Sequence, residues 1–206
     1  MDTVELDPTI LREYDIRGIV GHNFTPIVAK SLARAFGREV VRLCGDDCTV
    51  IVGRDGRLSS AEISKSVIDG LTSIGVNVID VGLGPTPLIY FGCYELSANA
   101  GIVITGSHNP ENYNGMKLVL DNKPFFGNDI QRLGLKLSEK SVLAAAGKVF
   151  EKDISDRYID RLLYRNKIPS NIKVVWDPGN GSSGKILSRI VSRINGTHKV
   201  INSEID

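Results

Sequence analysis

The sequence predicts an α/β fold: a mixed, mostly parallel sheet with helices on both faces, followed by the start of a second, similar α/β domain. Short apolar, β-branched runs alternate with longer segments of helical periodicity, which is the order of a sheet layered between helices. Glycine, proline and polar residues separate these segments. The alternation restarts beyond Pro169. We therefore expect a first domain at residues 1–150, and a linker helix with an incomplete second domain at residues 151–206.

Each element is predicted from its own pattern of residues. Buried strands are expected within residues 10–20, at 49–53, 76–81, 99–104, 116–120 and 172–177, and from about 199. Helices are expected at residues 26–43, 59–74, 88–94, 128–140, 148–166 and 185–195. Thr25 and Pro26 provide a cap and a first turn, whereas Ser59 and Glu62 have the spacing of a capping box. Gly75 is expected to end the second helix.

A polar loop, Thr105-Gly106-Ser107-His108-Asn109-Pro110, follows the buried run at residues 99–104. Open α/β sheets place their chemistry at the carboxyl ends of such strands. Gly106 permits a sharp turn and Pro110 stiffens the exit from the loop. We therefore expect the Ser107 hydroxyl to be presented to solvent from a rigid support.

The residues around Ser107 do not form the site of a serine hydrolase. The nucleophile elbow G-x-S-x-G is absent, because Ser107 directly follows Gly106 and no second glycine follows. His108 is the next residue, and neighbours on an extended backbone point in opposite directions. The remaining chemical role for Ser107 is to carry a phosphoryl group, which requires nearby cations and usually a metal. The alternative is a polar turn without chemistry.

Four motifs in this order resemble the α-D-phosphohexomutase family, the phosphomannomutases and phosphoglucomutases. The first three are Glu13-Tyr14-Asp15-Ile16-Arg17-Gly18, Gly53-Arg54-Asp55-Gly56-Arg57 and the loop at residues 105–110. The fourth, Asp177-Pro178-Gly179-Asn180-Gly181, is similar to the opening of that family's second domain. The resemblance spans nearly the whole chain, and it identifies residues 105–110 as the phosphoserine loop of domain I.

The resemblance implies a phosphohexomutase, which moves phosphate reversibly between O1 and O6 of a phosphorylated hexose. Ser107 would carry the phosphoryl group, through which it would also bind Mg²⁺, and a hexose 1,6-bisphosphate would be the intermediate and activator. Arg17 and Lys117 would lie in the active site, and Tyr14 and Arg17 would bind the substrate. Lys117 or His108 would assist proton movement, and which of the two is the base stays open.

The residues themselves support part of this interpretation. A lone lysine on a strand usually marks its solvent face, but a short hairpin-like connection can return Lys117 to the side of Ser107. Arg17 follows an apolar segment and precedes a turn glycine, so its planar fork can reach a phosphate. For Arg54 and Arg57 we expect a structural role, in which ion pairs hold loops near the site.

Two other functions remain open. Residues 179–185 nearly fit a phosphate-binding P-loop, but Ile186 stands where the hydroxyl that holds Mg²⁺ is required. A non-catalytic fragment that acts with a partner is the second alternative. Members of the resembled family have four domains, and their aspartate-rich metal loop lies later in the second one. We therefore expect this chain to be truncated and inactive alone, with the missing C-terminal domains as its natural partners.

Composition excludes several other classes of protein. The chain is 42% hydrophobic and 24% charged, with a formal net charge of +1, so nucleic acid is not the expected partner. No apolar run approaches the ~20 residues of a membrane span, and the first residues lack the pattern of a signal peptide. Cys44, Cys48 and Cys93 read as reduced thiols. These features predict a cytoplasmic protein.

Overall fold

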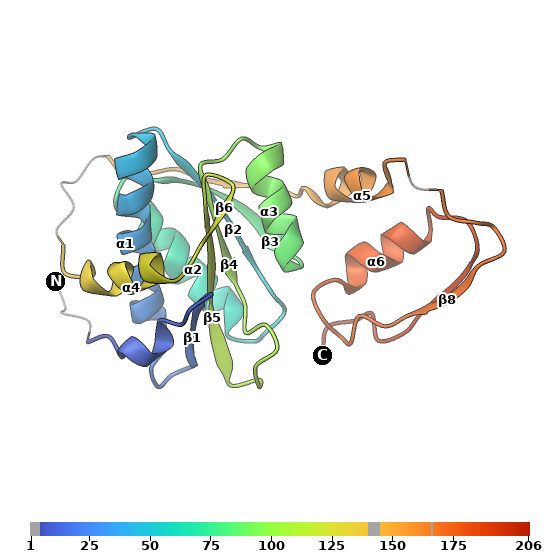
Figure 1. Cartoon of the computed structure of the whole chain (residues 1–206), viewed down its shortest axis with the longest axis horizontal. Helices are drawn as coiled ribbons and strands as arrows, with labels where there is room; N and C mark the ends of the chain where they lie inside the picture. Colours follow the sequence, from blue (N-terminus) through green and yellow to red (C-terminus); the bar gives the residue numbers. More distant parts are fainter. Residues whose placement is uncertain (1–4, 140–144, 166) are drawn as a thin grey trace.

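The computed structural model describes residues 5–139, 145–165 and 167–206, and its centre is a seven-stranded sheet (Figure 1). The strands are β1 (Ile16–Ile19), β2 (Thr49–Arg54), β3 (Asn77–Leu83), β4 (Ala100–Ile104), β5 (Tyr113–Leu120), β6 (Lys123–Phe125) and β7 (Val149–Glu151). Their order is β1-β5-β4-β2-β3-β7, and β6 pairs with β5. The pairings of β2 with β3 and β4 and of β3 with β7 are parallel, whereas β5 runs antiparallel to β1, β4 and β6. The mixed α/β class is therefore confirmed.

Helices cover both faces of this sheet, as predicted (Figure 1). On one face lie α1 (Pro26–Cys44), α2 (Ser60–Thr72) and α4 (Asn128–Leu135). On the other face lies α3 (Thr86–Glu95), against which α5 (Ser155–Leu163) packs. The predicted start of α1 is confirmed, because Pro26 is its first residue and the Thr25 hydroxyl accepts a hydrogen bond from the Val28 N–H. A short 3-10 helix, Pro8–Ile10, precedes β1.

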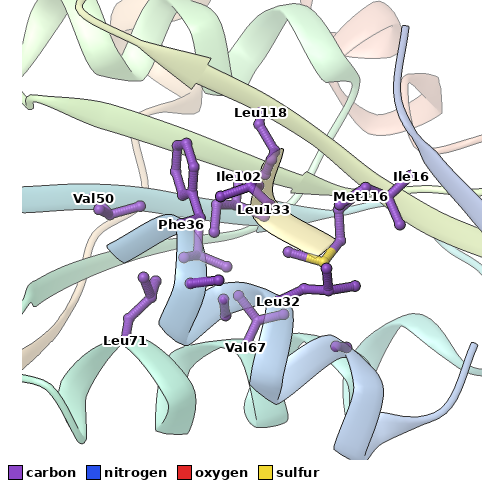
Figure 2. Packing of buried hydrophobic residues seen from close by; sticks show 14 of the residues in the cluster. Ile16, Leu32, Phe36, Val50, Val67, Leu71, Ile102, Met116, Leu118 and Leu133 are labelled. Atoms are coloured by element: carbon purple, nitrogen blue, oxygen red, sulfur yellow. The ribbon is translucent and has the colours of Figure 1, made fainter. Parts of the chain in front are cut away.

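Two apolar clusters form the core, one on each face of the sheet. Successive residues of β2 alternate between them, so that Val50 faces α1 and α2 while Ile51 faces α3. Figure 2 shows Leu32 and Phe36 of α1 packed toward Ile102 of β4. This burial on both faces makes the central strands, and hence the loops at their carboxyl ends, the rigid part of the molecule.

A second, two-stranded parallel sheet follows the first. It pairs β8 (Lys173–Trp176) with β9 (Thr197–Val200), and α6 (Gly184–Val191) connects them. Ile186 of α6 and Ile159 of α5 belong to the apolar cluster under α3, so this unit packs on the first one. A new strand-helix-strand unit thus begins where the sequence predicted it. The domain boundary after residue 150 stays a prediction.

The helix predicted over residues 148–166 is wrong in its first part. Val149–Glu151 forms β7, because the parallel edge of β3 offers hydrogen bonds that outweigh helical periodicity. The helix begins only at Ser155, whose N–H donates to the Asp153 carboxylate at 2.8 Å. Its predicted end, Asn166, lies outside the described residues.

Two further expectations differ from the structure. The helix predicted at residues 128–140 ends at Leu135, and Lys140 lies outside the described residues. The capping box of Ser59 and Glu62 is wrong, because Ser59 has a helical backbone and makes no cap bond. Among the described residues, the cysteines are free thiols and no helix is both long and apolar enough to cross a membrane.

Candidate active site

The candidate active site lies where the carboxyl end of β4 meets β1 and β5. Arg17 of β1 is the register partner of Gly115, and Lys117 of β5 is the register partner of Val103. The Thr105 N–H then donates to the Gly115 carbonyl at 3.1 Å. The sheet therefore brings Arg17 and Lys117 to the start of the loop that follows β4. The antiparallel pairing of β4 and β5 returns Lys117 to Val103, two residues before the loop, and its place beside Ser107 stays a prediction.

Ser107 is exposed and its backbone lies in the left-handed region, with a φ of +52°. For a residue with a Cβ this conformation costs roughly 1–2 kcal/mol and persists only where its surroundings hold it. The Ser107 N–H donates to the Thr105 hydroxyl at 2.8 Å, and the Asn109 N–H donates to the Gly106 carbonyl at 3.0 Å. The loop backbone is thus tied down, while no described residue bonds the Ser107 hydroxyl.

Arg57 holds the loop by its backbone. Its guanidinium donates to the carbonyls of Pro110 at 2.6 Å, Asn109 at 2.7 Å, and Ser107 and Tyr113 at 3.2 Å. A Cβ at Gly106 would lie 2.0 Å from Arg57 Nε, so glycine is what lets the guanidinium approach the backbone. The structural role predicted for Arg57 is confirmed.

Asp55 connects Arg57 to the same loop. Its Oδ2 accepts a hydrogen bond from the Gly106 N–H at 3.0 Å and lies 3.4 Å from Arg57 Nε, while its Oδ1 accepts from the Arg57 N–H at 3.1 Å. Reasoning from sequence missed this residue, although a carboxylate two positions before an arginine was a usable signal. Arg54, for which an ion pair was also predicted, has no side-chain hydrogen bond or ion pair to any described residue.

A second carboxylate, Asp15, joins the two cations of the site. Its Oδ2 accepts from Arg17 Nη2 at 2.5 Å and from Lys117 Nζ at 3.0 Å. Burial alone raises the pKa of the Asp15 carboxyl, but the hydrogen bonds and charges of Arg17 and Lys117 outweigh it, so that this pKa lies below its ordinary value. Asp15 was not selected from the sequence, although it lies two positions before Arg17 on an extended segment.

Arg17 also binds the beginning of the serine loop. Its Nη1 donates to the Thr105 carbonyl, and its side chain is only 1% exposed. In this arrangement Arg17 acts on the loop and on Asp15, whereas Lys117, 25% exposed, is the cation that solvent reaches. The Arg17 Nε is buried and has no hydrogen-bond partner among the described residues, so this guanidinium retains one donor.

The remaining predicted residues lie at the rim of the site. Tyr14 is 76% exposed, and His108 projects from the loop into solvent. Neither contacts another predicted site residue through a hydrogen bond or ion pair within the described part of the chain. Tyr90 of α3 was not indicated by the sequence, but it interacts electrostatically with Asp15. Burial raises the pKa of its phenol, and the negative charges of Cys93 and Asp15 raise that pKa further.

Metal ligands of the usual kind are absent from the described residues. No group of three or more His, Cys, Asp or Glu side chains in this part of the chain could hold a metal ion. The two carboxylates of the site, Asp15 and Asp55, are both engaged by cations. The described residues therefore do not form a Mg²⁺ site by themselves, and a phosphate on Ser107 would add an oxygen ligand.

The loop at residues 179–185 does not have the geometry of a P-loop. A P-loop directs its backbone N–H groups at a bound phosphate. Here the Gly179 N–H donates to the Asp177 carboxylate, and the Asn180 N–H donates to the Asn202 carbonyl. The Gly181 N–H donates to the Pro178 carbonyl in the same way. The chain thus satisfies its own donors, and the nucleotide-binding alternative has no support.

The fold and the site define an α/β domain that presents a serine from a clamped loop, next to an arginine and a lysine. Comparison with known proteins gives the same result. The family described as phosphoglucomutase/phosphomannomutase, alpha/beta/alpha domain I, matches residues 8–137. This chain therefore belongs to the phosphoglucomutase/phosphomannomutase family, and the resemblance seen in its motifs is confirmed.

Individual relatives extend the match over nearly the whole chain. A phosphomannomutase/phosphoglucomutase of Pseudomonas aeruginosa is 37% identical over 201 residues, which are 98% of this chain and 43% of the relative. A phosphoglucomutase of Neisseria gonorrhoeae is 36% identical over 200 residues, 96% of this chain and 43% of the relative. The chain thus spans less than half the length of the curated relatives it matches.

Solved structures give the same picture. The crystal structure of a phosphoglucomutase/phosphomannomutase family protein from Burkholderia thailandensis matches with a TM-score of 0.90 and 35% identity, over 98% of this chain and 45% of that one. A putative phosphomannomutase from Thermus thermophilus matches with a TM-score of 0.82 over 96% of this chain and 47% of that one. At 22% identity, the second match shows the fold alone.

Proposed function

We propose that this chain supplies the phosphoryl-carrying serine of a phosphohexomutase. The observation that carries the proposal is Ser107, an exposed hydroxyl in a left-handed backbone conformation that Arg57 and Asp55 hold in place. Strain kept at one polar residue by its surroundings is typical of a functional site. Family membership gives the class of reaction, which is the transfer of phosphate between two hydroxyls of one hexose.

The reaction has two balanced half-steps. Phosphorylated Ser107 gives its phosphoryl group to the O6 hydroxyl of a hexose 1-phosphate, whose proton leaves to a base, and the Ser107 Oγ takes up a proton. The product is a hexose 1,6-bisphosphate, which turns over in the site. Its O1 phosphoryl group then passes to the Ser107 Oγ, which loses its proton, while the O1 oxygen takes up a proton, and hexose 6-phosphate is released. A trace of the bisphosphate primes an enzyme that has lost its phosphate.

Positive charge around Ser107 favours both half-steps, because negative charge develops on the oxygens of the transferred group. Lys117 donates to Asp15, so we assign it an electrostatic role rather than that of a base. Arg17 contributes fixed charge from the buried side and holds the loop through the Thr105 carbonyl. We assign contact with the sugar to the Tyr14 phenol, which is exposed.

His108 is the proton acceptor that we favour. Its imidazole is exposed on the loop that carries Ser107, and no described residue occupies its ring nitrogens. Histidine is the side chain that most often acts as a general base. Replacement of His108 by Asn should therefore lower kcat, while the amount of phosphoserine formed at equilibrium stays the same.

Mg²⁺ would be held through an oxygen of the Ser107 phosphate, and it supplies charge neutralisation at the transferred group. The described residues offer no carboxylate cluster that could hold this ion by themselves.

The test uses a fusion of this chain to the part of the Pseudomonas aeruginosa relative that it does not span. With Mg²⁺ and glucose 1,6-bisphosphate, the fusion should convert glucose 1-phosphate or mannose 1-phosphate into the 6-phosphate and gain one phosphoryl group by intact mass. Ser107→Ala should remove the bound phosphate and lower turnover by orders of magnitude. A phosphate that persists in Ser107→Ala would place the carrier elsewhere and refute the proposal. The unfused chain should form no measurable product.

A further inference from the structure

A buried chain of hydrogen bonds lies behind the serine loop and begins at Asn114 of β5. The Asn114 side chain is fully buried, with 0% exposure. Its Nδ2 donates to Ser59 Oγ at 2.8 Å and to Ser60 Oγ at 2.9 Å, and its Oδ1 accepts from the Gly115 N–H at 2.8 Å. An amide in this position must be fully bonded, because a buried polar group without partners is costly.

The chain of bonds continues from α2 to the loop. Ser60, also 0% exposed, donates through its hydroxyl to Asp55 Oδ1 at 2.5 Å. The other oxygen of Asp55 accepts from the Gly106 N–H at 3.0 Å. Asn114, Ser60 and Asp55 therefore form one continuous hydrogen-bonded path that ends at the residue before Ser107.

The two ends of this path lie close in sequence to Lys117 and to Ser107, the two groups of the proposed reaction. Asn114 lies three positions before Lys117 on the same strand, and Gly106 is covalently bonded to Ser107. No direct hydrogen bond or ion pair joins Lys117 to Ser107 among the described residues. The path through α2 is thus a polar link that fixes the lysine strand against the serine loop from the side away from solvent.

We propose that Asn114 and Ser60 are positioning residues, which act through Asp55 to set the conformation of the loop at Ser107 relative to Lys117. This inference rests on the proposed role of Ser107 as phosphoryl carrier. A positioning role follows from the chemistry of transfer, because a misplacement of about 1 Å can cost roughly 10²-fold in rate. Buried networks of this kind rigidify a site when every member is bonded.

Helix α2 also contains a matched control residue for Ser60. Ser64 lies one turn after Ser60, is 3% exposed, and its hydroxyl has no hydrogen-bond partner in the described part of the chain. Ser60→Ala and Ser64→Ala thus remove the same group from two buried positions of one helix. Only the first substitution breaks the path to Gly106.

The first measurement is amide hydrogen exchange by NMR in the 206-residue chain itself, without substrate. Ser60→Ala and Asn114→Ala should each raise the exchange rate of the Gly106 amide about tenfold, whereas Ser64→Ala should leave it unchanged. The double variant Asn114→Ala/Ser60→Ala should exchange no faster than the faster single variant, since both break one path. An unchanged Gly106 rate, or equal increases in the Ser60 and Ser64 variants, would overturn the inference.

The second measurement uses the fusion enzyme and separates positioning from folding. Ser60→Ala should lower kcat by about ten- to a hundredfold with little change in KM, and Ser64→Ala should leave both constants unchanged. Equal kcat values for the two variants would refute the positioning role. A wild-type fusion that never carries phosphate would refute the proposed function instead, while the exchange measurement would still decide whether the path orders the loop.

Discussion

Replacement of Arg57 by Lys is the most direct test of how the serine loop is held. The substitution keeps the positive charge but removes the planar fork, which reaches three backbone carbonyls of the loop and that of Tyr113 at the start of β5. A lysine ammonium is a point charge on a flexible stem and can serve one or two of these acceptors. The loop should therefore lose the support that keeps Ser107 at a φ of +52°.

The size of the effect follows from the four contacts. Two are short, at 2.6 Å to Pro110 and 2.7 Å to Asn109, and a hydrogen bond to a charged group contributes about 1.5–3 kcal/mol. Arg57 is 19% exposed, so water can replace some of the hydrogen bonds that the carbonyls lose. The lysine ammonium keeps one or two of the others. We expect a net loss of about 2–3 kcal/mol in the free energy of unfolding.

Urea denaturation of the chain measures this difference. With a slope of roughly 2 kcal/mol per molar urea, the midpoint should fall by about 1 M in Arg57→Lys. Arg54→Lys is the matched control, because Arg54 belongs to the same motif but bonds no described residue through its side chain, and its effect should stay within about 0.5 kcal/mol. Equal midpoints for the two variants would refute the clamp.

Three more predictions concern the same loop and its surroundings. Gly106→Ala places a Cβ 2.0 Å from Arg57 Nε, so thermal unfolding should occur several degrees lower, and a circular dichroism melt that matches wild type would contradict the contact. Asp15 has a pKa below its ordinary value of 3.8, so it stabilises the fold above that pH and loses this contribution as the pH falls through the folded pKa. Asp15→Asn should therefore be less stable than wild type at pH 7, with a difference in urea midpoint that narrows below about pH 4. Lys117→Met should lower kcat/KM of the fusion by roughly 10²-fold, and wild-type kinetics would make it an ordinary surface cation.

Most elements of the fold follow from local signals in the sequence. The predicted start of α1 at Pro26 was correct because Thr25 supplies its cap within the same stretch of chain. The elements that were missed depend on partners elsewhere. The strand at Val149–Glu151 exists because β3 has an open edge, and the three-residue β6 exists because β5 passes beside it. Neither edge is visible in the residues that add to it.

The site divides in the same way. Ser107 and Arg57 were selected from the motifs, Ser107 as the phosphoryl carrier and Arg57 as a structural residue, whereas Lys117 was selected from its position on a strand close to the loop and from the resemblance. The roles of Asp15 and Asn114 require the register of β1 against β5 and the packing of α2, which link residues far apart in sequence. Sequence patterns indicate which groups are present, and the register of strands decides which of them meet.

One arrangement recurs in two motifs and explains how the backbone of the loop is held while the Ser107 hydroxyl stays unbonded by any described residue. In each motif a carboxylate lies two positions before an arginine, as Asp15 before Arg17 and Asp55 before Arg57, and each pair is joined by an ion pair. Arg17 binds the first carbonyl of the loop, and Arg57 binds three carbonyls further along it and that of Tyr113 at the start of β5. Both arginines act on backbone atoms, so the hydroxyl of Ser107 remains unbonded by any described residue. A phosphoryl carrier needs this combination, because its backbone must stay in place while its side chain alternates between a neutral hydroxyl and a charged phosphate.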